Sequence, residues 1–546
     1  MTHMTDKEIK PYWQEDGNQI WVGNSRDILK LQPKESVHMC CCSPPYWGLR
    51  DYDTTPQVWD DPGNCKHVWE NKIEASSRHR NMDAGSEKQF SNKGASERGY
   101  ARGQFCQHCN AWRGSLGLEP DPNDYIRHLV QIFDEVKRVL HPTGTLWIVI
   151  ADSYAGGGRA GKHGKAYGGI EQNRTNADCK WGPPTGRLKG IKPKDMVGIP
   201  WMLAFALRDA GWWLRKDIIW RKDNPMPGSQ TDRPTTSKEY VFLLSKSQRY
   251  FYDHEAIKEP YTEPINRWGG TELKQETIKH STYQDMQGLG GTSILRAGRN
   301  MRPDPGGKTK RDVWSAADNT ILLKWLSDNH PDILSEFGEA CRLKDDIWNV
   351  STKAFHGAHF AVYCPKLIAP AVLAGSSERG VCPDCLSPWE RIVDRRILEE
   401  LNEKPYHENG QMGGLGVPAR HGINHSTIGG QQNKVSFITI GWAPTCSCYG
   451  TDPLPAYPRK PKEEPDVEYT NRTRPILNKR IEMLDSWKGL KTIPAIVLDP
   501  FFGSGTSGYV ANKFGRKFIG SDLSEKYIED IAIPRVEGEI KQRSLF

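Results

Sequence analysis

Residues 495–515 read AIVLDPFFGSGTSGYVANKFG, an apolar run followed by a glycine-rich segment and a second, amphipathic run. The apolar residues before Asp499 predict a buried strand, and the residues from Gly508 onward predict a helix. Gly503, Gly505 and Gly508 give the spacing GxGxxG between these two elements. Because glycines in a strand–loop–helix unit allow a ligand to approach the backbone closely, this stretch predicts an α/β fold with a ligand site at the loop.

The residues around the glycines discriminate among the cofactors that bind such loops. No lysine directly follows the glycines, which argues against a nucleoside-triphosphate loop. Asp522 ends the next predicted strand at the distance needed to hold ribose hydroxyls, and Asp499 places a carboxylate beside the loop. A carboxylate suits the cationic methionine end of S-adenosyl-L-methionine (SAM) better than an anionic pyrophosphate, so SAM is favoured over NAD. Glycines that serve only close helix packing are the remaining alternative.

A second stretch, VHMCCCSPPY at residues 37–46, ends a predicted strand abruptly. Two prolines cannot continue a helix, and they remove donors from a sheet ladder, so the strand stops before Ser43. Ser43, Pro44, Pro45 and Tyr46 therefore follow the carboxyl end of a strand, which is where ligands bind in open α/β sheets. A proline turn with a packed tyrosine is the alternative.

The composition limits the class of protein. The length of 546 residues exceeds a single compact core, and 52 Gly and 37 Pro indicate many loops. The net charge of +7 fits a polyanionic partner without requiring one. No run approaches the roughly 18 apolar residues of a membrane span, and the polar start MTHMTDKEIKPYW does not resemble a signal peptide. Thirteen cysteines then favour metal sites and buried thiols over disulfides, in a reducing compartment that we expect to be the cytoplasm.

The motifs LDPFFGSGTSG (residues 498–508) and SPPY (residues 43–46) together resemble the signature motifs of the DNA amino-methyltransferases. That family modifies the exocyclic amine of cytosine or adenine. SPPY comes first and the glycine loop last, as in the β subgroup, and GWWLRKDIIWRKDNPMP is similar to a conserved block of phage-type members. The resemblance implies a Rossmann-like, circularly permuted SAM-dependent methyltransferase fold that acts on double-stranded DNA.

The resemblance also implies which residues hold the cofactor. They come from four separate stretches: Asn24, Tyr363, Asp499, Phe501, Gly503, Ser504, Gly505, Thr506 and Asp522. Asn24 stands where many members carry an aspartate near the SAM adenine, and its amide can still accept a hydrogen bond from the adenine amine. Tyr363 stands where a phenylalanine is usual in the methionine pocket.

The chemistry of an exocyclic amine explains the SPPY motif. The lone pair of such an amine is delocalised into the ring, so the amine is a poor nucleophile. The Ser43 hydroxyl and the Pro44 carbonyl, whose direction the prolines fix, would accept hydrogen bonds from its two N–H groups and align the lone pair with the SAM methyl group. Tyr46 would stack on the base after the base has flipped out of the duplex, and transfer would be direct. SPPY is typical of cytosine-N4 enzymes, so cytosine N4 is favoured and adenine N6 is the alternative.

Two groups of cysteine and histidine residues have the composition of tetrahedral zinc sites. The first metal set is Cys65, His67, Cys106 and Cys109, and the second metal set is Cys382, Cys385, Cys446 and Cys448. His108 could replace His67 in the first set. Both sets lie in stretches too polar to build a core of their own, so two structural zinc ions would supply the missing folding energy.

These motifs divide the chain into seven parts. The catalytic domain comprises residues 1–59, 118–258, 346–375 and 488–546, the zinc-binding inserts are 60–117 and 376–487, and the target-recognition region is 259–345. The candidate DNA contacts are Arg159, Lys162 and Lys165 in a basic glycine-rich loop, and Arg267, Arg296, Arg299 and Arg302 in the target-recognition region. A solvated linker is the alternative for the basic loop. A different class, a non-catalytic zinc-containing DNA-binding protein on a methyltransferase fold, also fits these stretches, and the sequence leaves monomer and homodimer open.

Overall fold

The computed structural model describes residues 10–48, 54–69, 104–155, 191–192, 194–222, 232–258, 310, 312–315, 365–394, 438–459, 461 and 466–543. The chain divides into two compact units. The first unit comprises Met1–Ala256, Arg311–Pro388 and Thr492–Phe546, and the second comprises Ile257–Lys310 and Trp389–Lys491. The predicted catalytic motifs, SPPY and the glycine loop, both belong to the first unit.

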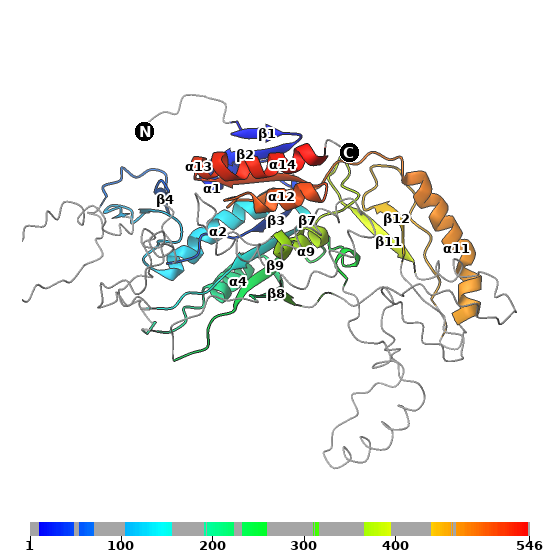
Figure 1. Cartoon of the computed structure of the whole chain (residues 1–546), viewed down its shortest axis with the longest axis horizontal. Coiled ribbons are helices and arrows are strands. Elements are labelled where there is room, and N and C mark those ends of the chain that lie inside the picture. The colour runs from blue at the N-terminus through cyan, green and yellow to red at the C-terminus, as the bar shows by residue number, and fades with distance from the viewer. Residues whose placement is uncertain are drawn as a thin grey trace, which may run out of the picture. The chain divides into compact units, whose positions relative to one another are not determined.

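A nine-stranded sheet forms the centre of the described part of the first unit (Figure 1). Its strand order is β1 (Trp13–Glu15), β2 (Asn18–Val22), β14 (Lys517–Asp522), β13 (Ile496–Asp499), β3 (Val37–Cys42), β7 (Leu140–Ile150), β9 (Lys238–Ser245), β8 (Trp213–Arg221) and β10 (Val313–Ser315). The five neighbouring strands from β2 to β7 are parallel, whereas β9 runs antiparallel to both β7 and β8. The carboxyl ends of five strands therefore meet along one edge of the sheet.

The strand order is circularly permuted, as the sequence predicts. The early strand β2 pairs in parallel with β14 near the end of the chain, so elements drawn in blue and red lie side by side in Figure 1. The strand that precedes the glycines, β13, lies between β14 and β3. The glycine loop and SPPY thus follow adjacent strands, although one is near the end of the chain and the other near its beginning.

Two groups of helices cover the sheet. The first group is α1 (Ser25–Leu31), α2 (Pro122–Val139) and α4 (Ile199–Asp209), and the second is α9 (Pro365–Gly375), α12 (Thr506–Lys513) and α14 (Ile533–Arg543). The short elements are η2 (Glu255–Ile257), α13 (Glu525–Tyr527) and the π-helical turn η5 (Ile528–Ala532). Cys40 and Cys42 of β3 pack in the same core cluster as the first helix group, whereas Met39 lies close to Gly375 of α9. Helices on both faces explain why all six residues of β3 are buried.

The three consecutive cysteines of β3 are packing residues. Cys40, Cys41 and Cys42 are at most 1% exposed, and desolvation raises the pKa of Cys41 and Cys42 well above the usual thiol value. A thiol that stays protonated is a weak nucleophile. The structure therefore confirms that these residues fill a buried strand.

A three-stranded sheet of order β4–β6–β5 contains the described ends of the predicted first insert. Its strands are β4 (Gln57–Trp59), β5 (Gln104–Phe105) and β6 (Trp112–Gly114). Trp59 and Trp112 pair directly across β4 and β6, and both belong to the main core cluster at 2% exposure. The core of the first unit thus supports the polar insert through Trp112, which pairs with Trp59 just before the insert.

The second unit is built around one hairpin and one long helix. Strands β11 (Trp389–Asp394) and β12 (Ile438–Pro444) pair antiparallel, and α11 (Asp466–Trp487) contacts β12. The sequence did not predict α11, because the helix has only a weak apolar stripe and contains Pro475. The strand β10 lies within the predicted target-recognition region, and its three residues are too few to show an alternating pattern in the sequence.

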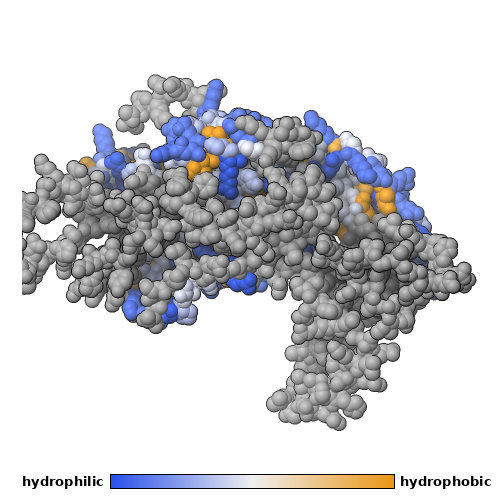
Figure 2. Space-filling model, viewed as in Figure 1, coloured by the Kyte–Doolittle hydropathy of each residue, from blue (hydrophilic) through white to orange (hydrophobic). Residues whose placement is uncertain are grey.

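The surface of the described residues is mostly hydrophilic on the face shown in Figure 2, where hydrophobic residues form small, separate areas. The large hydrophobic side chains that are exposed are Tyr12, Leu31, Val68, Met196, Phe205 and Trp213. Within the described residues, no helix combines the length and the apolar character needed to cross a bilayer.

Gly520→Ala tests the packing of Phe502 beneath the glycine loop. A Cβ at Gly520 would lie 2.4 Å from Phe502 Cδ2, so the ring must move. Overpacking of a core costs about 1–3 kcal/mol, so we expect a lower melting temperature. Gly538→Ala on α14 is the control, because no atom lies within 4 Å of the added Cβ and alanine favours helix. Equal melting temperatures for the two variants would contradict this packing.

Candidate functional site

The glycines of the loop between β13 and α12 have two different roles. Gly503 and Gly505 have φ angles of 47° and 74°, in the left-handed region that favours glycine. Gly505 is also the N-cap of α12, and a Cβ there would lie 3.3 Å from Ala532. Gly508 instead makes room for Phe502, whose Cζ would lie 2.7 Å from an added Cβ. Close packing therefore explains why residue 508 is glycine, whereas Gly503 and Gly505 allow the backbone conformation of the loop.

Two carboxylates hold the loop in place. Asp499 accepts hydrogen bonds from the Phe501 N–H at 2.9 Å and from the Ser507 hydroxyl at 2.6 Å. Asp522 accepts from the Gly503 N–H at 2.8 Å and from the Ser524 N–H at 2.9 Å. Desolvation raises the pKa of Asp522, and the backbone donors oppose that shift. Since an ionised carboxylate offers about four lone-pair sites, both groups can shape the loop and still accept from a ligand.

Arg535 also supports the loop, and sequence reasoning missed it. Its guanidinium, on α14, donates to the Thr506 hydroxyl at 2.8 Å and to the Ser504 carbonyl at 3.3 Å. It therefore braces two of the predicted cofactor residues. A lone arginine on a terminal helix has no spacing that would identify this role.

Asn24 lies at the end of β2, beside the end of β14. The adjacent Gly23 N–H donates to the Asp522 carbonyl at 2.9 Å. The Asn24 side chain caps α1 by accepting from the Arg26 N–H at 2.9 Å, and its amide nitrogen donates to Gln57 Oε1 at 2.9 Å. The structure thus assigns Asn24 a capping role, and its predicted contact with the adenine remains a prediction.

The SPPY loop (residues 43–48) is anchored by its backbone. The Tyr125 hydroxyl of α2 donates to the Pro45 carbonyl at 2.7 Å, and the Ser153 hydroxyl donates to the Trp47 carbonyl at 2.8 Å. Pro44 is buried and Ser43 is half-buried. Among the described residues, neither the Ser43 hydroxyl nor the Pro44 carbonyl has a hydrogen-bond partner. The loop is therefore fixed while its two predicted acceptors stay available.

The Tyr46 ring is held through its hydroxyl. It donates to Glu239 Oε2 of β9 at 2.7 Å, and Lys222 pairs with the other oxygen of this carboxylate. Glu239 is only 9% exposed. Sequence reasoning missed this pair, although a glutamate beginning the apolar run KEYVFLLS was a visible signal.

The described site residues converge on one edge of the sheet. Asp499 and Asp522 are the last residues of β13 and β14, and Asn24 and Ser43 come just after β2 and β3. These four strands are neighbours in the sheet. Eight predicted site residues lie outside the described part of the chain: Tyr363, Arg159, Lys162, Lys165, Arg267, Arg296, Arg299 and Arg302.

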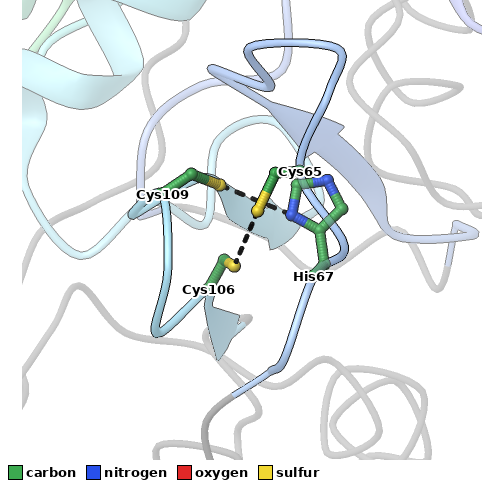
Figure 3. Close-up of side chains that lie close together, drawn as sticks. All are labelled: Cys65, His67, Cys106 and Cys109. Carbon is green, nitrogen blue, oxygen red and sulfur yellow. Dashed lines mark hydrogen bonds between the residues drawn. The ribbon is translucent and has the colours of Figure 1, made fainter.

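The first metal set comes together in the three-stranded sheet region (Figure 3). The ligand atoms of Cys65, His67, Cys106 and Cys109 all lie within 4.8 Å of one another. The sulfurs of Cys65 and Cys106 are 3.8 Å apart, and Cys109 Sγ lies 3.4 Å from His67 Nδ1. Zinc with bonds of about 2.3 Å to sulfur and 2.0 Å to nitrogen has tetrahedral edges of about 3.8 Å and 3.5 Å. The donor set and its spacing therefore fit zinc, and they select His67 rather than His108.

Neighbouring groups orient the histidine of the first metal set and shift the pKa values of its cysteines. Asp61 Oδ1 lies 3.3 Å from His67 Nε2, which leaves Nδ1 facing the sulfurs, as in carboxylate–histidine–metal arrangements. Desolvation raises the pKa of Cys65 to about 12. Desolvation acts in the same direction on Cys106, but the backbone donors of Cys109 and His108 and the His67 ring hold the pKa of Cys106 at about 5. One thiolate, the form that binds metal, is thus available at neutral pH.

The two Cys-x-x-Cys segments have the same backbone turn. The Cys106 carbonyl accepts from the Asn110 N–H at 2.9 Å, and Asn110 has a φ of 60°. The Cys382 carbonyl accepts in the same way from the Leu386 N–H at 2.9 Å, and Leu386 has a φ of 62°. Cys382 and Cys385 belong to the first unit, whereas Cys446 and Cys448 follow β12 in the second. The second zinc site remains a prediction from the spacing.

Comparison with known proteins identifies the family. The model of the DNA methylase family, of the N6/N4 methyltransferase type, matches residues 37–387 and 492–533. The type II methyltransferase M.SmaI of Serratia marcescens is 38% identical over 245 residues, which are 45% of this chain and 61% of that enzyme. The type II methyltransferase M.XycI of Xanthomonas campestris pv. cyanopsidis is 30% identical over 67% of this chain and 74% of its own length. The chain therefore belongs to the DNA methylase family.

Replacing the histidine of the first metal set should reduce the zinc content of the protein. Elemental analysis of purified His67→Ala should find about one zinc ion fewer per chain than in the native protein, because three ligands bind zinc more weakly than four. His108→Ala is the matched control and should keep its zinc. Native protein without zinc, or equal zinc loss in both variants, would show that this set is not the metal site.

Proposed function

We propose that this protein is a SAM-dependent DNA methyltransferase that methylates the exocyclic N4 amine of a flipped-out cytosine in double-stranded DNA. Membership of the DNA methylase family supports methyl transfer to DNA. The observation that carries the proposal is the pairing of β13 with β3, which places the glycine loop beside the SPPY loop. A cofactor loop and a pair of hydrogen-bond acceptors then share one edge of the sheet.

The glycine loop supports SAM as the cofactor. The loop follows β13 with two glycines in the left-handed region, and Asp522 ends the adjacent strand, where a ribose would lie. Asp499, Phe501, Ser504 and Thr506 belong to the same loop, so we propose them as further SAM contacts. SAM would supply the methyl group, and the glycine loop would fix the position of SAM.

The SPPY loop supports an amine as the acceptor of the methyl group. The Ser43 hydroxyl and the Pro44 carbonyl accept hydrogen bonds from the two N–H groups of the amine, which localises the lone pair on nitrogen and directs it at the methyl carbon. Buried hydrogen-bond acceptors that are positioned in advance lower the barrier because they need no reorganisation during reaction. Tyr46 stacks on the extruded base, with its ring set by the Glu239 contact.

Ser43 supports cytosine over adenine. Adenine-specific members of the family usually carry aspartate or asparagine at this position. A hydroxyl is shorter than either side chain and requires less charge compensation than an aspartate, and cytosine is the smaller ring. Adenine N6 is the second candidate, because the matched family includes both amines in its type. The basic residues of the loop around Arg159 and of residues 259–345 are proposed DNA contacts and target readers, on sequence grounds alone.

Gly505→Ala tests whether the glycine loop binds SAM. A side chain at a φ of 74° strains the loop by about 1–2 kcal/mol, which corresponds to a roughly tenfold loss of affinity if the loop must keep its course. Calorimetric titration of SAM should show this loss, and Asp522→Ala should show a similar one. Gly538→Ala is the control and should bind as the native protein does. Unchanged SAM affinity in both loop variants would remove the cofactor assignment and favour a non-catalytic DNA-binding protein.

The methylated base identifies the reaction. Unmethylated bacterial or phage DNA is incubated with the protein and SAM, digested to nucleosides and analysed by mass spectrometry; we expect N4-methylcytosine. Ser43→Ala should lower the rate about 10²-fold, as the loss of one positioned hydrogen-bonding group does in other enzymes. Ser36→Ala, outside the site, is the control. N6-methyladenine as the product would leave the mechanism in place and disprove the role assigned to Ser43.

A further inference from the structure

A buried histidine on α2 joins two carboxylates from different segments. His128 is 0% exposed and stacks on Trp59 and Trp112, with ring centroids 4.7 Å and 5.5 Å away. Its Nδ1 lies 2.9 Å from Glu119 Oε1, and its Nε2 lies 3.1 Å from Asp60 Oδ2. Buried ionisable groups are stable only when they are paired, so these three residues form a mutually dependent unit.

Asp60, at one end of this unit, is adjacent in sequence to a residue that contacts the first metal set. Asp60 follows β4 and accepts from Arg127 at 2.6 Å and from Gln131 at 2.7 Å, both on α2. The next residue, Asp61, faces the other way and contacts His67 Nε2 at 3.3 Å. Asp60 has a φ of 57°, a conformation that lets the two consecutive aspartates point in different directions. Consecutive carboxylates thus connect α2 with a metal ligand.

The other end leads to the SPPY loop. Glu119 Oε2 accepts from the Gly117 N–H at 2.8 Å, and the Gly117 carbonyl accepts from the Gly48 N–H at 2.8 Å. The Glu119 carbonyl also accepts from Trp47 Nε1 at 2.9 Å. Gly117 has a φ of 91°, and a Cβ there would lie 3.2 Å from the Tyr46 carbonyl. The segment that Glu119 holds is therefore in direct contact with the SPPY backbone.

We propose that Asp60, His128 and Glu119 are positioning residues that couple the first metal set to the SPPY loop. Metal binding orders His67 and Asp61, the three-residue unit fixes the segment around Gly117, and that segment fixes the backbone that carries the two amine acceptors. The metal then serves the geometry of methyl transfer as well as the stability of its own insert. This inference rests on the proposed methyltransferase function for its catalytic consequence, but the mechanical coupling stands without it.

Hydrogen–deuterium exchange tests the coupling without relying on activity. Removal of zinc from the native protein with a chelator, checked by elemental analysis, should increase deuterium uptake in peptides covering residues 43–48 and 115–119. Peptides covering 496–522, in β13, the glycine loop and β14, should keep their uptake. Unchanged uptake in 43–48 after verified zinc loss would overturn the proposal. If the glycine-loop peptides also lose protection, the protein has unfolded, and the Glu119→Gln variant then tests the coupling in zinc-loaded protein.

Glu119→Gln separates positioning from folding in the zinc-loaded protein. It keeps the side-chain shape but turns one of the two carboxylate oxygens into an amide NH2, so the side chain can no longer present an oxygen to both His128 Nδ1 and the Gly117 N–H. We expect native zinc content and SAM affinity, increased uptake in 43–48 and 115–119, and a single-turnover methylation rate at least about tenfold lower with saturating SAM and DNA. Glu135→Gln is the matched control. Glu135 lies on α2, the helix of His128, and pairs with the nearby Arg138, so this variant should resemble the native protein in every readout.

The outcomes distinguish the two proposals. Native uptake and native rate in Glu119→Gln would overturn the positioning role while the methyltransferase function stands. No methylation by the native protein, together with increased uptake in Glu119→Gln and after zinc removal, would overturn the function while the coupling stands.

Discussion

The parallel pairing of β13 with β3 is the contact on which the candidate site depends. It joins segments far apart in sequence: the Ile496 N–H donates to His38 Nδ1 at 2.9 Å across 458 residues of chain. His38 Nε2 lies 3.1 Å from the Leu386 carbonyl, and desolvation lowers the pKa of His38 to about 4, so the ring is neutral and serves as acceptor and donor at once. Helices cover both faces of β3, so a shift in its register would expose buried residues or bury polar ones. The positions of the glycine loop and the SPPY loop follow from this register.

Hydrogen bonds within the chain hold both loops of the candidate site. Asp499 and Asp522 each accept two hydrogen bonds from the chain around the glycine loop, and the Pro45 and Trp47 carbonyls are held by hydroxyls from α2 and the end of β7. Because these bonds order both loops when the protein folds, the loops lose little further conformational entropy when a ligand binds. The same carboxylates that suit SAM therefore also build the loop that would receive it.

Sequence reasoning identified the motifs whose residues are close together in the chain. It missed the hydrogen-bonded pairs whose residues come from distant segments. The strands at the two motifs and the glycine loop carry their signals in consecutive residues, and the ligands of the first metal set carry theirs in residue type and spacing. Arg535 and Glu119 have no such signal, and the position of Glu239 beside an apolar run does not reveal that its partner is Tyr46. Each of the three acquires its role only when a segment from elsewhere in the chain lies against it. Long-range pairing of polar side chains has no period, so no pattern in one sequence can reveal it.

The buried unit around His128 shows why such pairings occur in a core. Apolar side chains between Trp59 and Trp112 would fill the same space without the desolvation that an imidazole and two carboxylates incur. Apolar packing is non-directional, however, and leaves neighbouring segments free to slide by fractions of an ångström. Hydrogen bonds from a fixed imidazole to two carboxylates define distances and directions at both ends. A reaction that depends on aligning a lone pair with a methyl carbon needs that kind of restraint, because small misplacements of reacting groups reduce the rate steeply.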